Sequence, residues 1–262
     1  MRLTELIRSV VHTDNRIQVE VSDDWMQGRS VFGGLQAAIA VAAMRSLAPD
    51  LPLRTLQMTF IAPVPMGTVR AVAVLLRSGK STQHIQARIE DGSGALLALA
   101  IGVFGSGRPS RVQRELPIDR LHETGTSTGL PFLPGNTPNF LQHFGVTLHE
   151  GALPFANTPV HTNRYSLDLH DEGTTTEWHL LAIADFVPPV ALSWMDSAVP
   201  GSSLTWMLEL LVEDYTTQPL QGWQIGAELV AAGDGYTSQS TWIIAPDGRA
   251  VALSRQSMVV FA

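Results

Sequence analysis

Three polar positions in the second half of the chain stand in apolar settings, where an unpaired polar group is costly. Gln256 lies inside the last apolar run, GRAVALSRQSMVVFA, and Asp185 follows the apolar run LLAIA. A hydroxyl residue, Ser203 or Thr205, lies near the start of the run SSLTWML, residues 202–208. A carboxylate can take a proton from an attacking water, and an amide can orient that water or donate to an anion. Asp185 and Gln256 thus carry groups that could each act on a water.

Each of these residues also has a purely structural interpretation. Asp185 could cap the turn before two prolines, Gln256 could lie at a strand edge, and a hydroxyl at a strand start commonly bonds only to backbone. Ser203 and Thr205 are two positions apart, so a regular strand would place both on one face. The alternation around Gln256 does not decide which face of its strand is inside.

The composition is typical of a folded domain and argues against nucleic acid as a partner. The 262 residues are 45% hydrophobic and 16% charged, and the net charge of −7 comes without a basic cluster. The absence of cysteine excludes disulfides, thiolate metal sites and a cysteine nucleophile. The amphipathic N-terminus contains acids and no apolar run reaches spanning length, so we expect a cytoplasmic protein without signal peptide or membrane span.

The chain repeats itself. Gly94 of DGSGALLALAIGVF matches Gly248 of APDGRAVALSRQSMVVF, and 248 − 94 = 154. Gly79 matches Gly233 at the same offset, and RTLQMTF resembles SSLTWML at an offset near 148. Each half carries a helical run followed by alternating, strand-like runs joined by turn signals. The pattern indicates duplication of one α+β unit.

The helical run GGLQAAIAVAAMRSLAP is apolar on most faces, which is typical of a helix surrounded by protein. An antiparallel sheet wrapped around one buried helix is the hotdog arrangement. We therefore expect an α+β double hotdog, with repeats at 1–107 and 160–262. The segment between them, 108–159, is rich in Gly, Pro, Thr and Asn and is interpreted as a linker with loops and one strand at FGVTLHEGAL.

The two halves differ at the polar positions. The helical run of the first half carries no acid where the second half has Asp185. At the 154-residue offset the counterpart of Gln256 is Gly102, since 256 − 154 = 102. The candidate chemistry therefore belongs to one half of a duplicated unit.

These segments resemble the acyl-CoA thioesterase II family, which has the double-hotdog fold. The likeness covers most of the chain and is strongest after residue 176. AIADFVPPVAL resembles the segment with the catalytic aspartate, matching Asp185, and ALSRQ the segment with the glutamine, matching Gln256. PGSSLTW resembles the strand opening with the hydroxyl residue, at Ser203 or Thr205. VFGGLQAA, with Phe32, Gly33 and Gly34, resembles the helix start near the acyl site.

The resemblance implies an acyl-CoA thioesterase in which Asp185, Ser203 or Thr205, and Gln256 bind a water that attacks the thioester, with no metal or redox cofactor. A non-catalytic acyl-binding protein on the same fold is the alternative, because fold does not determine function. A hydratase is a third reading, and would need a histidine beside an acid in the pocket. Because sheet edges tend to be paired or covered, we also expect a homodimer or a larger symmetric oligomer.

Other chemistries find less support in the sequence. His161, His170 and His179 lack the spacing of zinc ligands and are interpreted as surface or loop residues. The GxSxG match GTSTG, at 125–129, lies in the segment rich in Gly, Pro and Thr and not between a strand-like and a helical run, so it is not the elbow of an α/β-hydrolase serine. SGKS is too short for a phosphate-binding loop and is interpreted as a turn.

Overall fold

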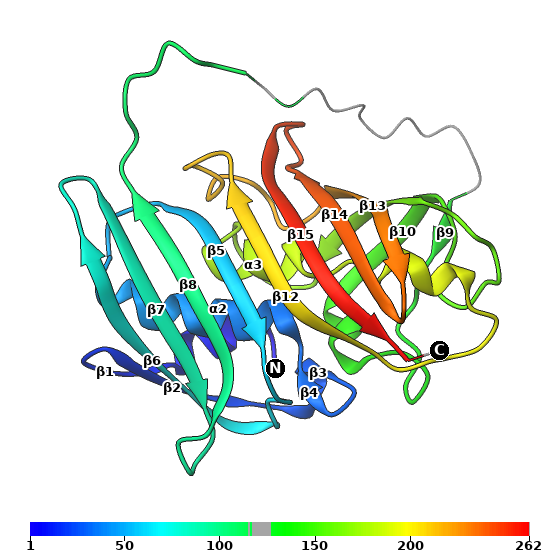
Figure 1. Ribbon diagram of the computed structural model, residues 1–262, viewed down its shortest axis with the longest axis horizontal. Coiled ribbons are helices and arrows are strands. Elements are labelled where there is room, and N and C mark those ends of the chain that lie inside the picture. The colour runs from blue at the N-terminus through cyan, green and yellow to red at the C-terminus, as the bar shows by residue number, and fades with distance from the viewer. Residues whose placement is uncertain (115, 117–126, 262) are drawn as a thin grey trace.

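The computed structural model describes residues 1–114, 116 and 127–261 (Figure 1). The first half contains α1 (Leu3–Ser9), β1 (Val11–Thr13), β2 (Arg16–Val21), the 3-10 turn η1 (Asp23–Trp25), β3 (Met26–Gln27), β4 (Ser30–Val31), α2 (Gly33–Arg45), β5 (Leu53–Phe60), β6 (Gly67–Ser78), β7 (Thr82–Glu90) and β8 (Leu96–Gly105). The rest contains β9 (Thr128–Gly129), η2 (Asn139–His143), β10 (Phe144–Glu150), β11 (Thr162–Leu169), α3 (Glu177–Ala184), η3 (Val190–Trp194), β12 (Gly201–Leu210), β13 (Trp223–Gly233), β14 (Tyr236–Ile244) and β15 (Ala250–Val260).

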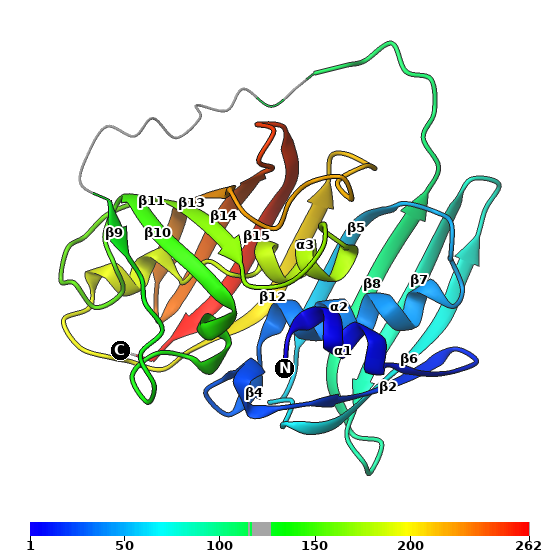
Figure 2. The same cartoon turned by 180° about the vertical axis from the view of Figure 1, so that it is seen from behind.

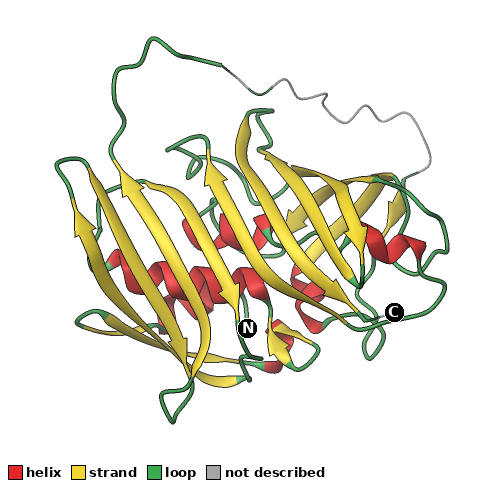
Figure 3. Cartoon of the chain, viewed as in Figure 1, coloured by secondary structure: helices red, strands yellow, loops and turns green. Residues whose placement is uncertain are grey.

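The described strands build one large antiparallel sheet with the helices on one side of it (Figures 2 and 3). Its order is β1-β2-β6-β7-β8-β5-β12-β15-β14-β13-β11-β10-β9, and β3 pairs with β4 separately. The order from β2 to β5 is repeated in reverse from β12 to β11, so the two halves meet where β5 pairs with β12. The predicted double hotdog is confirmed.

The strand ladder refines the offset of the repeat. Leu56 on β5 lies opposite Gly102, and Trp206 on β12 lies opposite Gln256. The offset in these strands is therefore 206 − 56 = 150, in agreement with the predicted offset near 148, while the offset of 154 holds for Gly102 and Gln256. Both β5 and β12 also carry a bulge, at Arg54 and at Leu204, which again differ by 150.

Helix α2 forms because its sequence is rich in alanine and has apolar residues on every face. All of its residues from Gly34 to Met44 are buried. It runs antiparallel to α3: its first turn lies against Ala182, and Arg45 at its end forms an ion pair of 2.6 Å with Glu177 at the start of α3. The start of α2 and the end of α3 are thereby brought together at the centre of the molecule.

The segment expected to be a linker, 108–159, contains secondary structure in its second part. Strand β10 is the strand expected near FGVTLHEGAL, and it pairs with β9 and with β11. Residues 115 and 117–126 of the segment lie outside the described residues. The division of the chain at 107 and 160 stays a prediction. Among the described residues, no helix combines the length and apolar character needed to cross a membrane.

Candidate functional site

Asp185 lies at the C-terminal cap of α3, with φ −97° and ψ −2°. The apolar run before it is buried along all of α3 except Glu177. The helix cannot continue far beyond this point, because Pro188 and Pro189 lack the N–H groups that helix hydrogen bonds require. The sequence thus ends a buried helix on an acid and holds that acid inside the protein.

Two donors from other elements reach the Asp185 carboxylate. Gln256 on β15 donates from Nε2 to Oδ1, and the backbone N–H of Gly34 in the first turn of α2 also forms a hydrogen bond to Asp185. The first N–H groups of a helix have no partner within the helix, and they carry its positive dipole end. The site therefore joins the end of α3, the start of α2 and the last strand of the sheet.

The surroundings of Asp185 hold its pKa near physiological pH. Burial raises the pKa of Asp185 to about 7, and the hydrogen bonds from Gln256 and Gly34 lower it, less strongly than burial raises it. A general base works best when its pKa lies near the working pH. This is the electrostatic property that a water-activating carboxylate needs.

The two glycines at the start of α2 are required by close contacts. A Cβ on Gly33 would lie 2.6 Å from Oδ2 of Asp185 and 3.2 Å from the Phe60 ring. A Cβ on Gly34 would lie 2.9 Å from the backbone of Ala182. The missing side chains let the helix end approach both the carboxylate and α3. Phe32, at the N-cap, is buried, and its ring stacks on that of Phe140 with centroids 4.1 Å apart, so it packs at the start of α2.

Replacement of Gly33 by alanine is expected to damage the site. Alanine is the better helix former, so propensity alone predicts a slight gain in stability. The clash with Oδ2 of Asp185 should instead displace the carboxylate and lower any hydrolytic activity that depends on it by about tenfold or more, since an ångström of misplacement can cost that much. The control is Gly92→Ala, because a Cβ there meets no atom within 4 Å. Equal activity of the two variants would contradict the role assigned to Gly33.

Gln256 faces the interior. It is 6% exposed, while its neighbours Arg255 and Ser257 are exposed on the opposite face of β15. On the inner face it lies between Trp206 on β12 and Gln239 on β14, its two cross-strand partners. The sequence alternation did not show which face of β15 is inside. The burial of Gln256 and its hydrogen bond to Asp185 show that its amide points toward the helices.

Ser203 and Thr205 lie on opposite faces of β12, contrary to the expectation from their spacing. The bulge at Leu204 shifts the register, so that Ser203 lies opposite the buried Met258 and Thr205 opposite the exposed Ser257. Ser203 is half-buried on the inner face, one rung from Gln256, and Thr205 is exposed. Within the described residues, the Ser203 hydroxyl forms no hydrogen bond to Asp185 or Gln256. The structure brings together Asp185 and Gln256, with Ser203 nearby.

The corresponding place in the first half is filled by apolar atoms. A Cβ on Gly102 would lie 2.7 Å from the sulfur of Met44 and 2.9 Å from the Phe104 ring. The counterpart of the Asp185 end of α3 is the end of α2, where Arg45 bonds to Glu177 and to two backbone carbonyls. The first half therefore has neither the acid nor the space for an amide.

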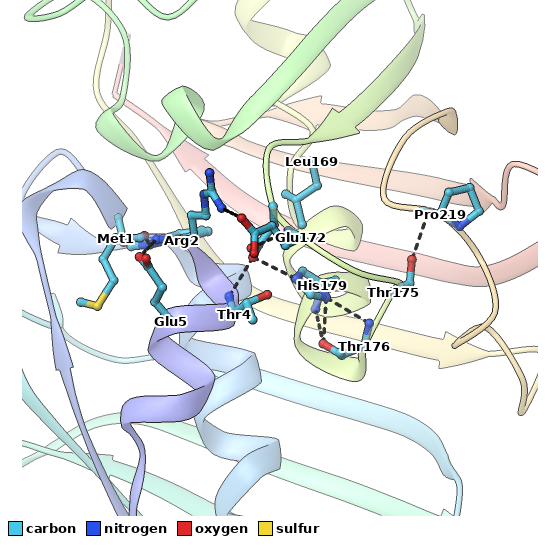
Figure 4. A network of polar contacts seen from close by, with 12 residues as sticks. Met1, Arg2, Thr4, Glu5, Leu169, Glu172, Thr175, Thr176, His179 and Pro219 are labelled. Atoms are coloured by element: carbon cyan, nitrogen blue, oxygen red, sulfur yellow. Dashed lines mark hydrogen bonds and ion pairs between the residues drawn. The ribbon is translucent and has the colours of Figure 1, made fainter.

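A second buried polar cluster lies at the opposite end of α3 (Figure 4). His179 is 1% exposed, so its interpretation as a surface or loop residue was wrong, whereas His161 and His170 are exposed. Its Nδ1 accepts from the N–H of Thr176 at 3.0 Å, which leaves Nε2 to donate to Asp171 at 3.1 Å. Asp171 also accepts from the N–H of Thr4, so the pair ties α1 to α3.

This histidine and acid do not form an accessible reaction site. Both side chains are 1% exposed, and both have partners. Burial lowers the pKa of His179, while the hydrogen bond from His179 helps to hold the pKa of Asp171 below its usual range. A pair closed to substrate gives the hydratase reading no support. Among the residues that the structure describes, no group of three or more His, Asp or Glu is arranged to hold a metal ion.

The match to known families falls on both halves of the chain. Residues 21–105 match the N-terminal domain of acyl-CoA thioesterase, and residues 119–260 match its C-terminal domain. The chain belongs to the acyl-CoA thioesterase family. Membership of this family supports thioester hydrolysis as the general type of reaction. No curated protein sequence matches the chain.

Solved structures share this fold over the whole length. A conserved protein of unknown function with a hot dog fold from Alicyclobacillus acidocaldarius has a TM-score of 0.87 and 20% identity, covering 100% of this chain and 99% of that one. A putative thioesterase II from Thermobifida fusca has a TM-score of 0.80 and 17% identity over 100% and 98%. An acyl-CoA thioesterase II from Mycobacterium marinum has a TM-score of 0.71 and 14% identity over 98% and 97%.

Sequence reasoning missed two groups that lie at or beside this site. The Gly34 N–H was not expected as a donor to Asp185, because backbone donors leave no mark in the residue type. Gln239 was also missed, although the offset that singled out Gln256 pairs it with Ile85, since 239 − 154 = 85. A systematic comparison of polar residues in one half with apolar residues in the other would have found it.

Proposed function

We propose that this protein hydrolyses an acyl-CoA thioester to a free carboxylic acid and coenzyme A, with Asp185 as the general base. The contact between Asp185 and Gln256 at the start of α2 carries the proposal. Asp185, whose pKa is about 7, lies beside the N-terminus of α2. The carboxyl group can activate a water, and the helix N-terminus can stabilise an oxyanion.

The reaction begins with a water held by the Asp185 carboxylate, the Gln256 amide and the Ser203 hydroxyl. Asp185 takes one proton as the water oxygen attacks the thioester carbon, and a tetrahedral oxyanion forms. Backbone N–H groups in the first turn of α2, other than that of Gly34, which bonds to Asp185, stabilise this oxyanion, because they have no partner within the helix. The carbon–sulfur bond then breaks, the departing thiolate receives a proton from Asp185, and the carboxylic acid is released and ionises.

Ser203, rather than Thr205, is the hydroxyl partner in this scheme. Of the two hydroxyl residues, Ser203 lies on the inner face of the sheet, the face that Gln256 of β15 also occupies, and Thr205 does not. Ser203→Ala is expected to lower kcat by about three- to tenfold, the size of one neutral hydrogen bond to the reacting water at about 1 kcal/mol. Thr205→Val should leave kcat unchanged within twofold. The reverse order, measured by release of coenzyme A under saturating substrate, would assign the role to Thr205.

The decisive test of the function is an assay of coenzyme A release from a series of acyl-CoA substrates of increasing chain length. Hydrolysis of at least one substrate, lost in Asp185→Asn, supports the proposal. Binding of acyl-CoA without release by the folded wild-type protein would overturn it in favour of the non-catalytic acyl-binding alternative. We also propose that the active species is a homodimer or larger oligomer, which light scattering would distinguish from a 28.4 kDa monomer.

A further inference from the structure

Gln239 is a buried amide beside Gln256 that the proposed reaction does not use. It is 1% exposed and lies on the inner face of β14, directly opposite Gln256 on β15. Side chains opposite one another in an antiparallel pair have Cβ atoms about 5 Å apart, within reach of two glutamine side chains. An amide in such a position must satisfy its donors and its acceptor, or it lowers stability.

One end of the Gln239 amide is fixed. Its Oε1 accepts a hydrogen bond of 2.7 Å from the backbone N–H of Val190. Val190 begins η3, immediately after Pro188 and Pro189, which lie three and four residues beyond Asp185 in the chain. Because Oε1 is turned toward Val190, the NH₂ group of Gln239 is turned away from it. That Nε2 is buried and, among the described residues, has no acceptor.

The amide of Gln256 presents the complementary arrangement. Its Nε2 donates to Asp185, so its Oε1 is directed elsewhere, and the structure gives that oxygen no donor within the described residues. Glutamine can exchange its oxygen and its NH₂ by rotating about the last bond, and with the oxygen toward Asp185 the contact would be repulsive. A donor next to Oε1 of Gln256 would prevent that rotation.

We propose that Gln239 is a positioning residue: a small movement of its side chain brings the unpartnered Nε2 to Oε1 of Gln256, and the hydrogen bond so formed keeps the NH₂ of Gln256 turned to Asp185. The N–H of Val190 fixes the orientation of Gln239, Gln239 fixes Gln256, and Gln256 donates to the carboxylate. The inference deepens the proposed function, since it supplies the reason that the Gln256 amide is held in the orientation the reaction requires.

The comparison of the two halves supports this assignment independently. The counterparts of Gln239 and Gln256 are Ile85 and Gly102, which lie opposite one another on β7 and β8. The half without the acid therefore lacks both amides, and the half with the acid has both. A glutamine kept only to fill the core of β14 would not need to accompany Gln256.

The test compares Gln239→Leu with Thr241→Val. Thr241 is the matched control, because it lies on the same face of β14 one rung away, is 5% exposed, and has a hydroxyl that likewise lacks a partner among the described residues. Gln239→Leu is expected to lower kcat by about tenfold, the scale of losses found for residues that orient a functional group, with KM unchanged within twofold. Thr241→Val should change neither.

The pH profile separates positioning from packing. The Gln256 hydrogen bond lowers the pKa of Asp185, so a poorly oriented amide should shift the acid limb of kcat/KM upward, on the order of half to one unit, in Gln239→Leu. The groups that act on this carboxyl are Gln256 and the N–H of Gly34, neither of which titrates. A loss of stability with an unchanged acid limb would make Gln239 a packing residue and would overturn the proposal.

Two further measurements keep the test independent of activity and of the variant's folding. The pKa of Asp185 can be followed by ¹³C NMR of its carboxyl carbon, which reports on the site even if no thioester is hydrolysed. In the wild-type protein, the side-chain NH₂ protons of Gln239 should exchange slowly and show a nuclear Overhauser effect to the Gln256 side chain. Fast exchange without this effect would contradict the hydrogen bond directly.

Discussion

Asp185→Asn is expected to reduce kcat for thioester hydrolysis by about a hundredfold or more, the contribution typical of a general base. Asparagine preserves the size of the side chain and one acceptor oxygen for Gln256, so the loss reports on the missing base rather than on a rearranged site. In the wild-type protein, kcat/KM should rise with pH and level off above about 7, because only the ionised form of Asp185 accepts a proton. Asp185→Asn should lose this limb together with the activity.

The same substitution is expected to stabilise the protein at alkaline pH. The pKa of Asp185 is raised from its usual 3.8 to about 7 in the folded state, so between these values the folded chain holds a proton that the unfolded chain has lost. The free energy of unfolding therefore falls as pH rises through this window. Three units correspond to about 4 kcal/mol. We expect Asp185→Asn to recover about 1 to 3 kcal/mol at pH 8, since asparagine offers one acceptor to two donors, and much less at pH 4.

Asp171→Asn is the matched control at the other end of α3. Asp171 is a buried carboxylate whose pKa is held below its usual value by His179 and by the N–H of Thr4. Removing its charge should therefore destabilise the protein at neutral pH while leaving kcat of the folded enzyme near the wild-type value. Opposite signs of the stability change in chemical denaturation, with activity lost only in Asp185→Asn, are the expected pattern. Full turnover in Asp185→Asn would rule out the general base.

The repeat made the fold predictable, because matching strands at constant offsets imply matching elements, and the apolar run from Gly33 onward implies a buried helix. The same comparison predicted that Asp185 and Gln256 belong to one half only. Their contact could not be derived from it, because the sequence does not state which face of the last strand is inside. The burial of Gln256 and its contact with Asp185 decide that question, and the pairing of β15 with β12 and β14 shows that Gln256 shares this face with Trp206 and Gln239.

Two local features could not be predicted from the sequence patterns, for physical reasons. The bulge at Leu204 changes the parity of β12, so Ser203 and Thr205 face opposite ways despite their spacing. The burial of His179 was hidden because a histidine in an apolar helix has no distinctive pattern. It is tolerated inside because Thr176 and Asp171 satisfy both ring nitrogens. Long-range partners of this kind appear only when the elements are packed.

Gln256→Ala is expected to lower kcat almost as strongly as Asp185→Asn near neutral pH. The variant loses the amide that we propose holds the water, and it also loses the hydrogen bond that lowers the pKa of Asp185. With that pKa raised above about 7, less of the base is ionised at neutral pH, so part of the activity should return as the pH is increased. Ser257→Ala, a neighbour facing away from the site, is the control and should behave as wild type.

The double variant shows whether the two residues act as one unit. If Gln256 works through the Asp185 carboxylate and the shared water, its removal should add little once the base is gone, and Asp185→Asn/Gln256→Ala should be no slower than Asp185→Asn within about threefold. Independent contributions would instead multiply to a loss on the order of ten thousandfold. Measured single-turnover rates that multiply in this way would refute the shared water, and Gln256 would then contribute to catalysis separately from the base.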